Sequence, residues 1–161
     1  HQAPDLVVVT GVTEFKVIDK VINLAAAGNT VICPASSPNA LVFLERMIEL
    51  YPPHLHQQTR TLLSVILKAA VAQTLMPRAD GEGLVAAYEV MIAIPSVQTA
   101  IREGKIQSVS GIMATSGREY GMSSQEMALR ALVKKNLITE EEAFRRASNP
   151  EALKKMMSLP Y

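Results

Sequence analysis

Apolar residues in the first part of the chain change from an unbroken run to a helical spacing and back. Residues 6–9 are continuously apolar, which predicts a short strand buried on both faces, as in a parallel sheet. Apolar positions then recur at helical spacing over 17–25, and Gly28 stands where such a helix would end. Residues 31–33 predict a second strand. Strand, helix and strand within about thirty residues predict the βαβ unit of an α/β fold.

Two helices are predicted next. Ser37 followed by Pro38 is a favoured helix start, because serine caps the first turn and proline suits its first position. The apolar stripe that follows ends at Pro52 and Pro53, which would stop the helix. A further helix is predicted over residues 57–72.

A hairpin is predicted after these helices. Residues 73–77 and 84–92 have the composition of strands, and the glycine-containing segment 80–83 supplies a turn between them. Glu89 stands between apolar neighbours in the second strand, so strand alternation favours an outward position for it.

Beyond Pro95 the pattern is helical to the end. We expect a short helix over 96–103, closed by Gly104, then a weaker helix over 106–114 and a loop over 116–121. Three more helix starts are predicted, two of them from capping boxes: Ser123 with Glu126, Thr139 with Glu142, and Asn149 with Pro150. The chain therefore divides into a mixed α/β part over 1–94 and a helical part over 95–161.

Composition narrows the class of protein. The chain has 161 residues, with 48% hydrophobic and 19% charged residues, which fits one globular domain or a fragment of a larger one. The net charge of +1 gives no indication of a nucleic-acid or acidic-membrane partner. No apolar run is long enough for a membrane span. Because the chain opens with His1 and enters an apolar run almost at once, we expect that it was cut from a longer protein.

Residues with catalytic chemistry are few. The sequence contains neither a Gly-x-x-x-x-Gly-Lys-Ser/Thr phosphate loop nor a Gly-x-Gly-x-x-Gly motif after a strand. His54 and His56 could approach one metal ion, but two histidines without a nearby cysteine or carboxylate favour a structural or solvent-facing role. Cys33 lies in a predicted buried strand and is expected to pack rather than react. These residues alone leave the function open.

Several longer strings resemble one family. The segments 45–52, 72–77, 80–91 and 101–105 are similar, in that order, to stretches of type IV pilus and type II secretion ATPases, and the last resembles the signature of their PilT-like retraction (twitching-motility) branch. The resemblance implies the C-terminal portion of a RecA-like P-loop ATPase core with a β-hairpin, over 1–94, followed by a helical subdomain, over 95–161. It also implies a hexameric ring at the cytoplasmic face of the inner membrane that uses ATP and Mg²⁺.

Several expected site residues differ from the family pattern. Thr10 and Gly11 stand where the family has Gly-Glu after the Walker B strand, and Asn29 and Ser36 stand where the His box has its two histidines. Glu14 matches another acidic position of the family. We expect it in the first turn of a helix, where it would not replace the Walker B glutamate. The phosphate loop lies upstream in the family. Each lost preorganised group costs roughly 10²–10³ in rate, so we expect no ATP hydrolysis by this chain alone.

Three charged residues remain as candidates for functional contacts. Arg46 follows the His box, where a salt bridge with Glu45 or Glu49 competes with contact to a neighbouring subunit or nucleotide. Arg102 and Glu103 survive from the retraction signature, although Gln98 and Ala100 replace other members of it, and a charged helix C-terminus explains them equally. Arg60 is expected to be solvated.

Three functions follow from the resemblance. The chain could be part of a ring subunit of a pilus or secretion motor with a degenerate ATPase site. It could instead be a non-catalytic module that binds the active retraction ATPase or the inner-membrane platform protein of the pilus. It could also be a stable folding unit cut from a working enzyme. In each case we expect neither nucleic-acid binding nor direct insertion into a membrane, and no resident metal in this chain.

Overall fold

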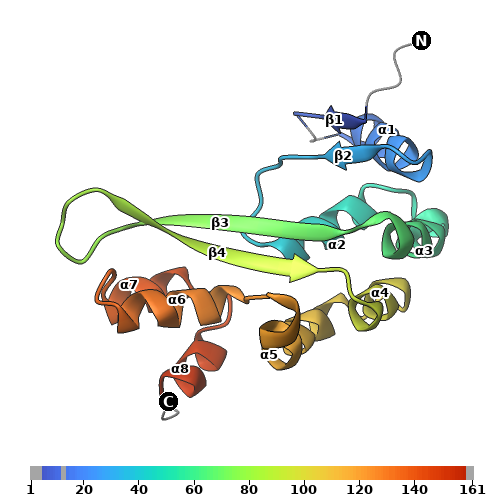
Figure 1. Cartoon of the computed structure of the whole chain (residues 1–161). Helices are drawn as coiled ribbons and strands as arrows, with labels where there is room; N and C mark the ends of the chain where they lie inside the picture. The colour runs from blue at the N-terminus through green and yellow to red at the C-terminus, as the bar shows by residue number, and fades with distance from the viewer. Residues whose placement is uncertain (1–4, 12–13, 159–161) are drawn as a thin grey trace. The chain divides into compact units, whose positions relative to one another are not determined.

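The chain folds into two compact units with mixed α/β structure. The computed structural model describes residues 5–11 and 14–158. The first unit contains segments from the start of the chain to residue 37 and the segments 41–68 and 93–109; the second contains 38–40, 69–92 and the segment from 110 onward. Figure 1 shows the order of the elements along the chain.

The first unit begins with the predicted βαβ arrangement. Strand β1 (Leu6–Val8) pairs in parallel with β2 (Thr30–Ile32), and helix α1 (Phe15–Ala26) connects them. Helix α1 buries Ile18, Val21 and Ile22, which recur at helical spacing. Gly28 has a φ of +96°, so the chain turns sharply after the helix at a residue without a Cβ. The βαβ prediction is confirmed.

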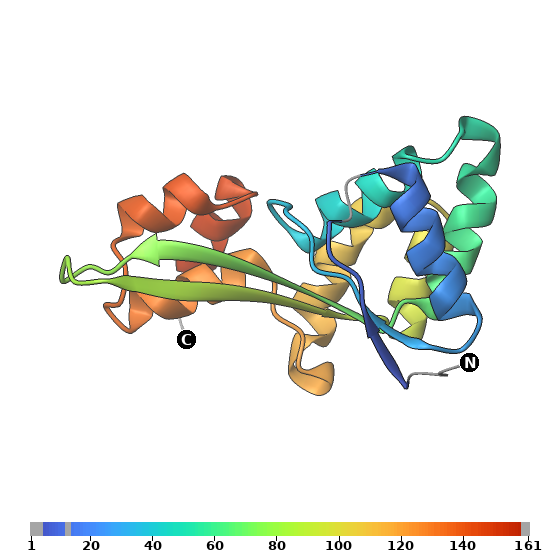
Figure 2. The ribbon, with the colours of Figure 1, turned by 90° about the horizontal axis from the view of Figure 1, so that it is seen from above.

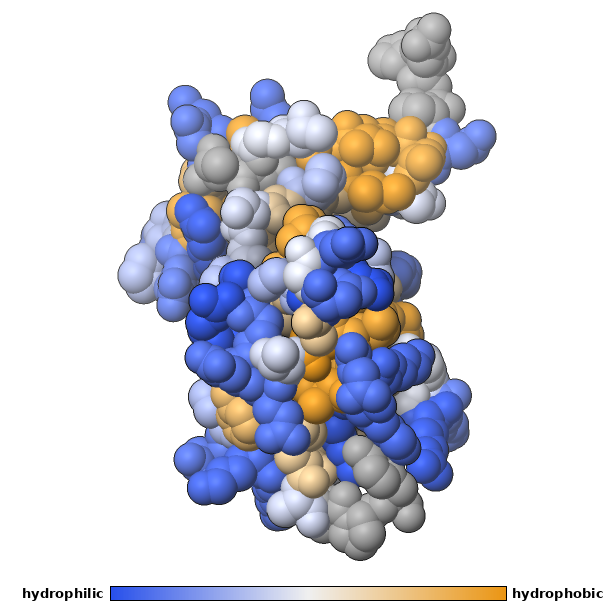
Figure 3. All heavy atoms as spheres, turned by 90° about the vertical axis from the view of Figure 1, so that its left-hand side faces the viewer, coloured by the Kyte–Doolittle hydropathy of each residue, from blue (hydrophilic) through white to orange (hydrophobic). Residues whose placement is uncertain are grey.

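The expectation that the first strand is buried on both faces is wrong. Leu6 and Val8 are 50% and 57% exposed, and Ile32 on the paired strand is 51% exposed. Val7 and Val31, which point the other way, are half-buried. The described residues therefore cover only one face of this pair. Figure 3 shows hydrophobic side chains gathered at the surface at the level where Figure 1 places β1 and β2.

Helices make up the rest of the first unit. They are α2 (Ala40–Glu49), α3 (His56–Ile66), α4 (Pro95–Arg102) and two short 3₁₀ turns, η1 (Pro53–Leu55) and η2 (Ile106–Ser108). Helix α2 starts three residues after the predicted cap Ser37. The predicted end of α3 at residue 72 is also wrong, because Leu67 adopts an extended backbone that leads into the next strand.

The second unit is built on the predicted hairpin. Strand β3 (Ala69–Pro77) pairs antiparallel with β4 (Leu84–Ile92) over their full lengths. Helices α5 (Val109–Tyr120), α6 (Gln125–Lys134), α7 (Glu140–Arg146) and α8 (Pro150–Ser158) follow. Figure 2 shows α6 to α8 gathered beside the turn end of the hairpin. No helix among residues 5–11 and 14–158 is long and apolar enough to span a membrane.

One face of the hairpin carries the hydrophobic core of the second unit. Its buried members come from both strands and from the helical segment: Met76, Ala87, Leu129, Ile138, Ala143 and Leu153. Glu89 is also buried, at 6% exposure, so its expected outward position is wrong. Residues 87, 89 and 91 share one face because side chains alternate along a strand, and this face contacts α6.

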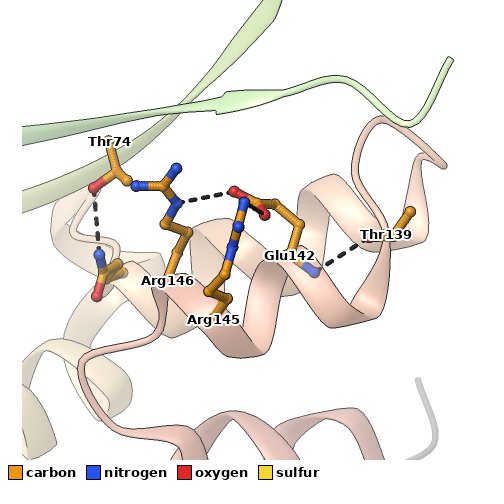
Figure 4. Close-up of polar contacts among 6 residues, drawn as sticks. Thr74, Thr139, Glu142, Arg145 and Arg146 are labelled. Carbon is orange, nitrogen blue, oxygen red and sulfur yellow. Dashed lines mark hydrogen bonds and ion pairs between the residues drawn. The ribbon is translucent and has the colours of Figure 1, made fainter. Parts of the chain in front are cut away.

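Helix caps in the second unit agree with the sequence in one case and differ in the other. The Thr139 hydroxyl accepts from the Glu142 amide at 3.2 Å, as predicted, and the Glu142 carboxylate pairs with Arg145 and Arg146 (Figure 4). Ser124, rather than Ser123, caps α6 by accepting from Met127. Ser123 is engaged elsewhere, because its backbone forms a bridge to Val90.

The expected loop over 116–121 is mostly helical, because α5 continues to Tyr120. Gly117 lies inside this helix for a packing reason: a Cβ there would approach the Met122 carbonyl oxygen to 2.7 Å. Gly121, with a φ of +69°, then ends the helix. Ser116, Gly117 and Gly121 give this segment the composition of a loop, although residues up to Tyr120 are helical.

Candidate functional site

The two carboxyl ends of the parallel strands lie at the same edge of the β1–β2 pair. Val9 extends this pairing, since its amide donates to the Ile32 carbonyl at 2.9 Å. Thr10 and Gly11 follow β1 at this edge, and Ser36 follows β2; all three are exposed. Asn29 precedes β2 and lies at the opposite edge. The structure thus places Thr10 and Gly11 at one edge and Asn29 at the other, while Ser36 comes four residues after the end of β2.

Position 11 is shaped for glycine. Its φ is +71°, in the left-handed region that disfavours residues with a Cβ, and no described atom lies within 4 Å of an ideal Cβ there. Glu14 precedes the first turn of α1 with an extended backbone, so its expected place within that turn is wrong. It is the N-cap residue of α1, and its carbonyl accepts from Val17 and Ile18.

The residues at this edge do not fit a magnesium–nucleotide complex. Magnesium is held by carboxylate oxygens and substrate phosphates, and Thr10, Gly11 and Ser36 provide no carboxylate. In the part of the chain that the structure describes, no group of three or more His, Cys, Asp or Glu side chains could hold a metal ion.

Asn29 has a structural role at the end of α1. Its side-chain Nδ2 donates to the Leu24 carbonyl at 2.9 Å, and its backbone amide approaches the same carbonyl at 3.2 Å. Carbonyls of a last helical turn need such partners. The asparagine at this position therefore stabilises the helix end.

Arg46 is an exposed residue of α2. Its expected salt bridge with Glu45 or Glu49 is absent among the described residues. Glu45 instead accepts from the Gln107 side chain at 2.7 Å. The guanidinium is thus available on the surface of the first unit.

Arg102 and Glu103 lie at the C-terminal end of α4, and both are exposed. Arg102 Nη2 donates to the Thr99 hydroxyl at 3.2 Å, one helical turn earlier. The Glu103 carboxylate pairs with Lys105 at 2.8 Å, and this ammonium lowers the pKa of Glu103. Within residues 5–11 and 14–158, the partners found for both side chains lie on their own segment.

Two residues of α3 contact the C-terminal end of α4. The sequence did not indicate a functional role for either of them. Gln57 bonds to the Arg102 backbone at 3.1 Å, and Arg60 is half-buried against Gly104. The expectation that Arg60 is solvated is wrong. The only signal in the sequence for these contacts is that Gln57 and Arg60 are three positions apart, which places both side chains on one face of a helix.

The remaining candidates have structural environments. The His56 Nε2 lies 2.7 Å from the Tyr51 carbonyl oxygen, so this ring stabilises the chain between α2 and α3. Burial raises the pKa of the Cys33 thiol, which makes the reactive thiolate less available.

Comparisons with known proteins give a consistent answer. No family model matches the chain. A twitching motility protein of Neisseria gonorrhoeae is 32% identical over 153 residues, which cover 95% of this chain and 41% of that protein. The type IV pilus ATPase PilU of Pseudomonas aeruginosa is 34% identical over 159 residues, which cover 99% of this chain and 41% of PilU.

A solved structure agrees with these relatives. The crystal structure of the pilus retraction motor PilT with bound ADP matches with a TM-score of 0.85 and 28% identity, covering 95% of this chain and 42% of that one. The chain therefore spans about two fifths of the length of the curated relatives it matches.

Proposed function

We propose, since this chain belongs to the PilT- and PilU-like family of type IV pilus ATPases, that it is part of a ring subunit of a pilus or secretion motor whose nucleotide site is degenerate. In this proposal residues 1–94 belong to a RecA-like ATPase core and 95–161 to a helical subdomain. The longer protein acts from the cytoplasmic side of the inner membrane, through assembly with other motor subunits and the pilus platform.

The observation that carries the proposal is the end of β1. An ATPase of this kind needs a carboxylate there, and the chain has Thr10 followed by a glycine in a left-handed conformation. Ser36, which follows β2 and is exposed, adds no charge or imidazole. Loss of one preorganised group costs roughly 10²–10³ in rate, and several losses together leave negligible turnover.

The open face of the β1–β2 pair supports membership of a larger core. Parallel sheets are nearly always covered on both faces, because their crossover helices lie on both sides. Leu6, Val8 and Ile32 are each at least half exposed. We propose that elements of the longer protein cover this face, as a RecA-like sheet requires.

Phosphate release by the longer protein tests the degenerate site. We expect no measurable ATP turnover from the wild type and a gain from the double substitution Thr10→Gly with Gly11→Glu, which restores the family order. The matched control is Thr10→Gly with Gly11→Gln, which has the same shape without the charge. Because both side chains meet the same backbone strain at position 11, a difference between them reports the carboxylate.

Turnover by the wild type at the rate of an intact pilus ATPase would overturn the degenerate site. The ring is tested separately by mass photometry of the longer protein with nucleotide. We expect a ring-sized species, either alone or when the active retraction ATPase is added. A strictly monomeric protein in both mixtures would refute the motor subunit.

A non-catalytic binding module is the second candidate. Asn29 is compatible with it, because its side chain donates to the Leu24 carbonyl and so stabilises the end of α1. This module would bind the retraction ATPase without entering its ring. A stoichiometry of bound copies that differs from ring replacement, measured by native mass spectrometry, would favour the module over the subunit.

Arg46, Arg102 and Glu103 are the proposed contact residues. All three are exposed on the first unit, and none of their side chains has a hydrogen bond or ion pair outside its own local segment among the described residues. In the proposal they contact a neighbouring subunit. Substituting each by alanine should weaken assembly and leave the free energy of unfolding of this chain nearly unchanged.

A further inference from the structure

Helix α4 ends at a turn that two side chains of α3 hold. The Gln57 Oε1 accepts from Arg60 Nη2 at 3.0 Å, and the Gln57 Nε2 donates to the Arg102 carbonyl at 3.1 Å. A single amide therefore connects the Arg60 guanidinium with the backbone of Arg102. The last carbonyls of a helix have no partner within it, so Gln57 satisfies one that α4 leaves open.

The turn itself has the geometry of a Schellman motif. Gly104 has a φ of +73°, its amide donates to Ile101 at 3.1 Å, and the Lys105 amide donates to Ala100 at 2.8 Å. This conformation brings the glycine backbone against Arg60. An ideal Cβ at Gly104 would lie 3.4 Å from Arg60 Nε and 3.5 Å from its Cζ.

The Arg60 side chain is positioned by packing as well as by hydrogen bonding. Its Nε is buried and has no hydrogen-bond partner among the described residues. A planar guanidinium can lie against a glycine backbone, whereas a lysine ammonium is a compact charge on a flexible stem. The contact therefore depends on arginine at position 60, whereas glycine at position 104 is favoured by its positive φ, since a Cβ there would make only ordinary van der Waals contact with Arg60.

We infer that Gln57 and Arg60 are positioning residues that fix the last turn of α4 and so the direction in which Arg102 and Glu103 project. The functional value of that direction rests on the proposed contact role of Arg102 and Glu103. The restraint on the turn does not, because it follows from the α3–α4 contacts alone. The partner that this arrangement suits is a protein surface that offers a carboxylate to Arg102 and a cation to Glu103.

Amide hydrogen exchange in the 161-residue chain tests the restraint. Gln57→Ala should accelerate exchange at the amides of residues 103–105 by about fivefold, the effect of one lost hydrogen bond. The matched control is Gln58→Ala, since Gln58 is the adjacent glutamine of α3 and is also exposed. Equal exchange at these amides in the two variants would overturn the inference.

Two conservative variants separate the parts of the contact. Gln57→Glu keeps an acceptor for Arg60 but cannot donate to the Arg102 carbonyl, so it should accelerate exchange like Gln57→Ala. Arg60→Lys keeps the charge but loses the planar contact with Gly104, so it should also accelerate exchange. Wild-type exchange in both variants would show that these contacts do not restrain the turn.

Binding of the longer protein to the retraction ATPase of the same organism tests the functional consequence. Gln57→Ala should weaken binding severalfold in the wild-type background and have no further effect when Arg102 and Glu103 are already alanine. Additive losses would overturn positioning through these residues. If the Arg102 and Glu103 substitutions leave binding unchanged, their proposed contact role fails, while exchange still decides whether Gln57 and Arg60 hold the turn.

Discussion

The two strand pairs of this protein differ in how far other elements cover them. No residue of β1 or β2 is fully buried, in the structure as described, whereas the inner face of the β3–β4 hairpin contains Met76 and Met91 at 0% exposure. The difference lies in the covering elements. The hairpin has a helical segment of its own unit packed on one face, and β1–β2 has α1 as its main helical neighbour. A β-branched run therefore predicts a strand but leaves open whether its face is covered.

Truncating a side chain in each region should give the largest contrast. Leu129 is 0% exposed in the core of the second unit, so Leu129→Ala should lower the free energy of unfolding by about 2–5 kcal/mol. Leu6 is 50% exposed on β1, and Leu6→Ala should cost less than about 1 kcal/mol. Urea denaturation of the 161-residue chain measures both.

The same substitutions in the longer protein test whether further elements cover β1 and β2. If further elements cover β1–β2, Leu6→Ala should cost about 2 kcal/mol or more there, because its side chain is then buried. An unchanged small cost in the longer protein would contradict the proposed covering of this face. Equal costs for Leu6 and Leu129 in the short chain would contradict the comparison itself.

The buried carboxyl on the hairpin should make stability depend on pH. Burial raises the pKa of Glu89 to about 7, the Glu126 carboxylate adds to the rise, and the Ala40 amide opposes it by donating to Glu89. The folded chain therefore binds a proton that the unfolded chain has released between pH 4.5 and 7. The contribution of Glu89 is fully present below pH 4.5 and is lost as the pH rises through about 7.

Glu89→Gln should remove this dependence. At pH 8 the variant should be more stable than the wild type by on the order of 1–2 kcal/mol, because a neutral amide replaces a buried charge. Thermal denaturation from pH 4 to 8 measures the difference. The control is Glu82→Gln in the exposed hairpin turn. Parallel pH profiles for the wild type and Glu89→Gln would show that the carboxyl is not buried on the covered face.

Local signals in the sequence predicted much of the fold and little of the site. The βαβ unit, β4 and the Thr139 cap follow from apolar spacing and capping chemistry, which act within a few residues. The inward position of Glu89 and the contact of Arg60 with Gly104 depend on elements far away in sequence. Such contacts leave no local pattern, so the sequence predicted both side chains to face solvent.

The two adjacent serines before α6 test the structure against the sequence at one position. Ser124→Ala should destabilise the chain by about 1 kcal/mol, because it removes the acceptor for the Met127 amide. Ser123→Ala should cost less, since its bonds to Val90 use the backbone and survive the substitution. Chemical denaturation of both variants distinguishes them. A larger destabilisation by Ser123→Ala than by Ser124→Ala would indicate that Ser123 caps α6, as the sequence predicted.

Two glycines give the smallest contrast. Gly11 after β1 has a φ of +71°, so Gly11→Ala should destabilise by up to about 1 kcal/mol, although a Cβ there meets no described atom. Gly111 lies inside α5 with open space around it, so Gly111→Ala should stabilise by about 0.5–1 kcal/mol. Thermal denaturation measures the opposite signs. Two stabilising substitutions would mean that the turn after β1 accepts a side chain without strain. The backbone at position 11 would then accept a glutamate without strain, and Gly11→Glu would test the nucleotide site without a cost in stability.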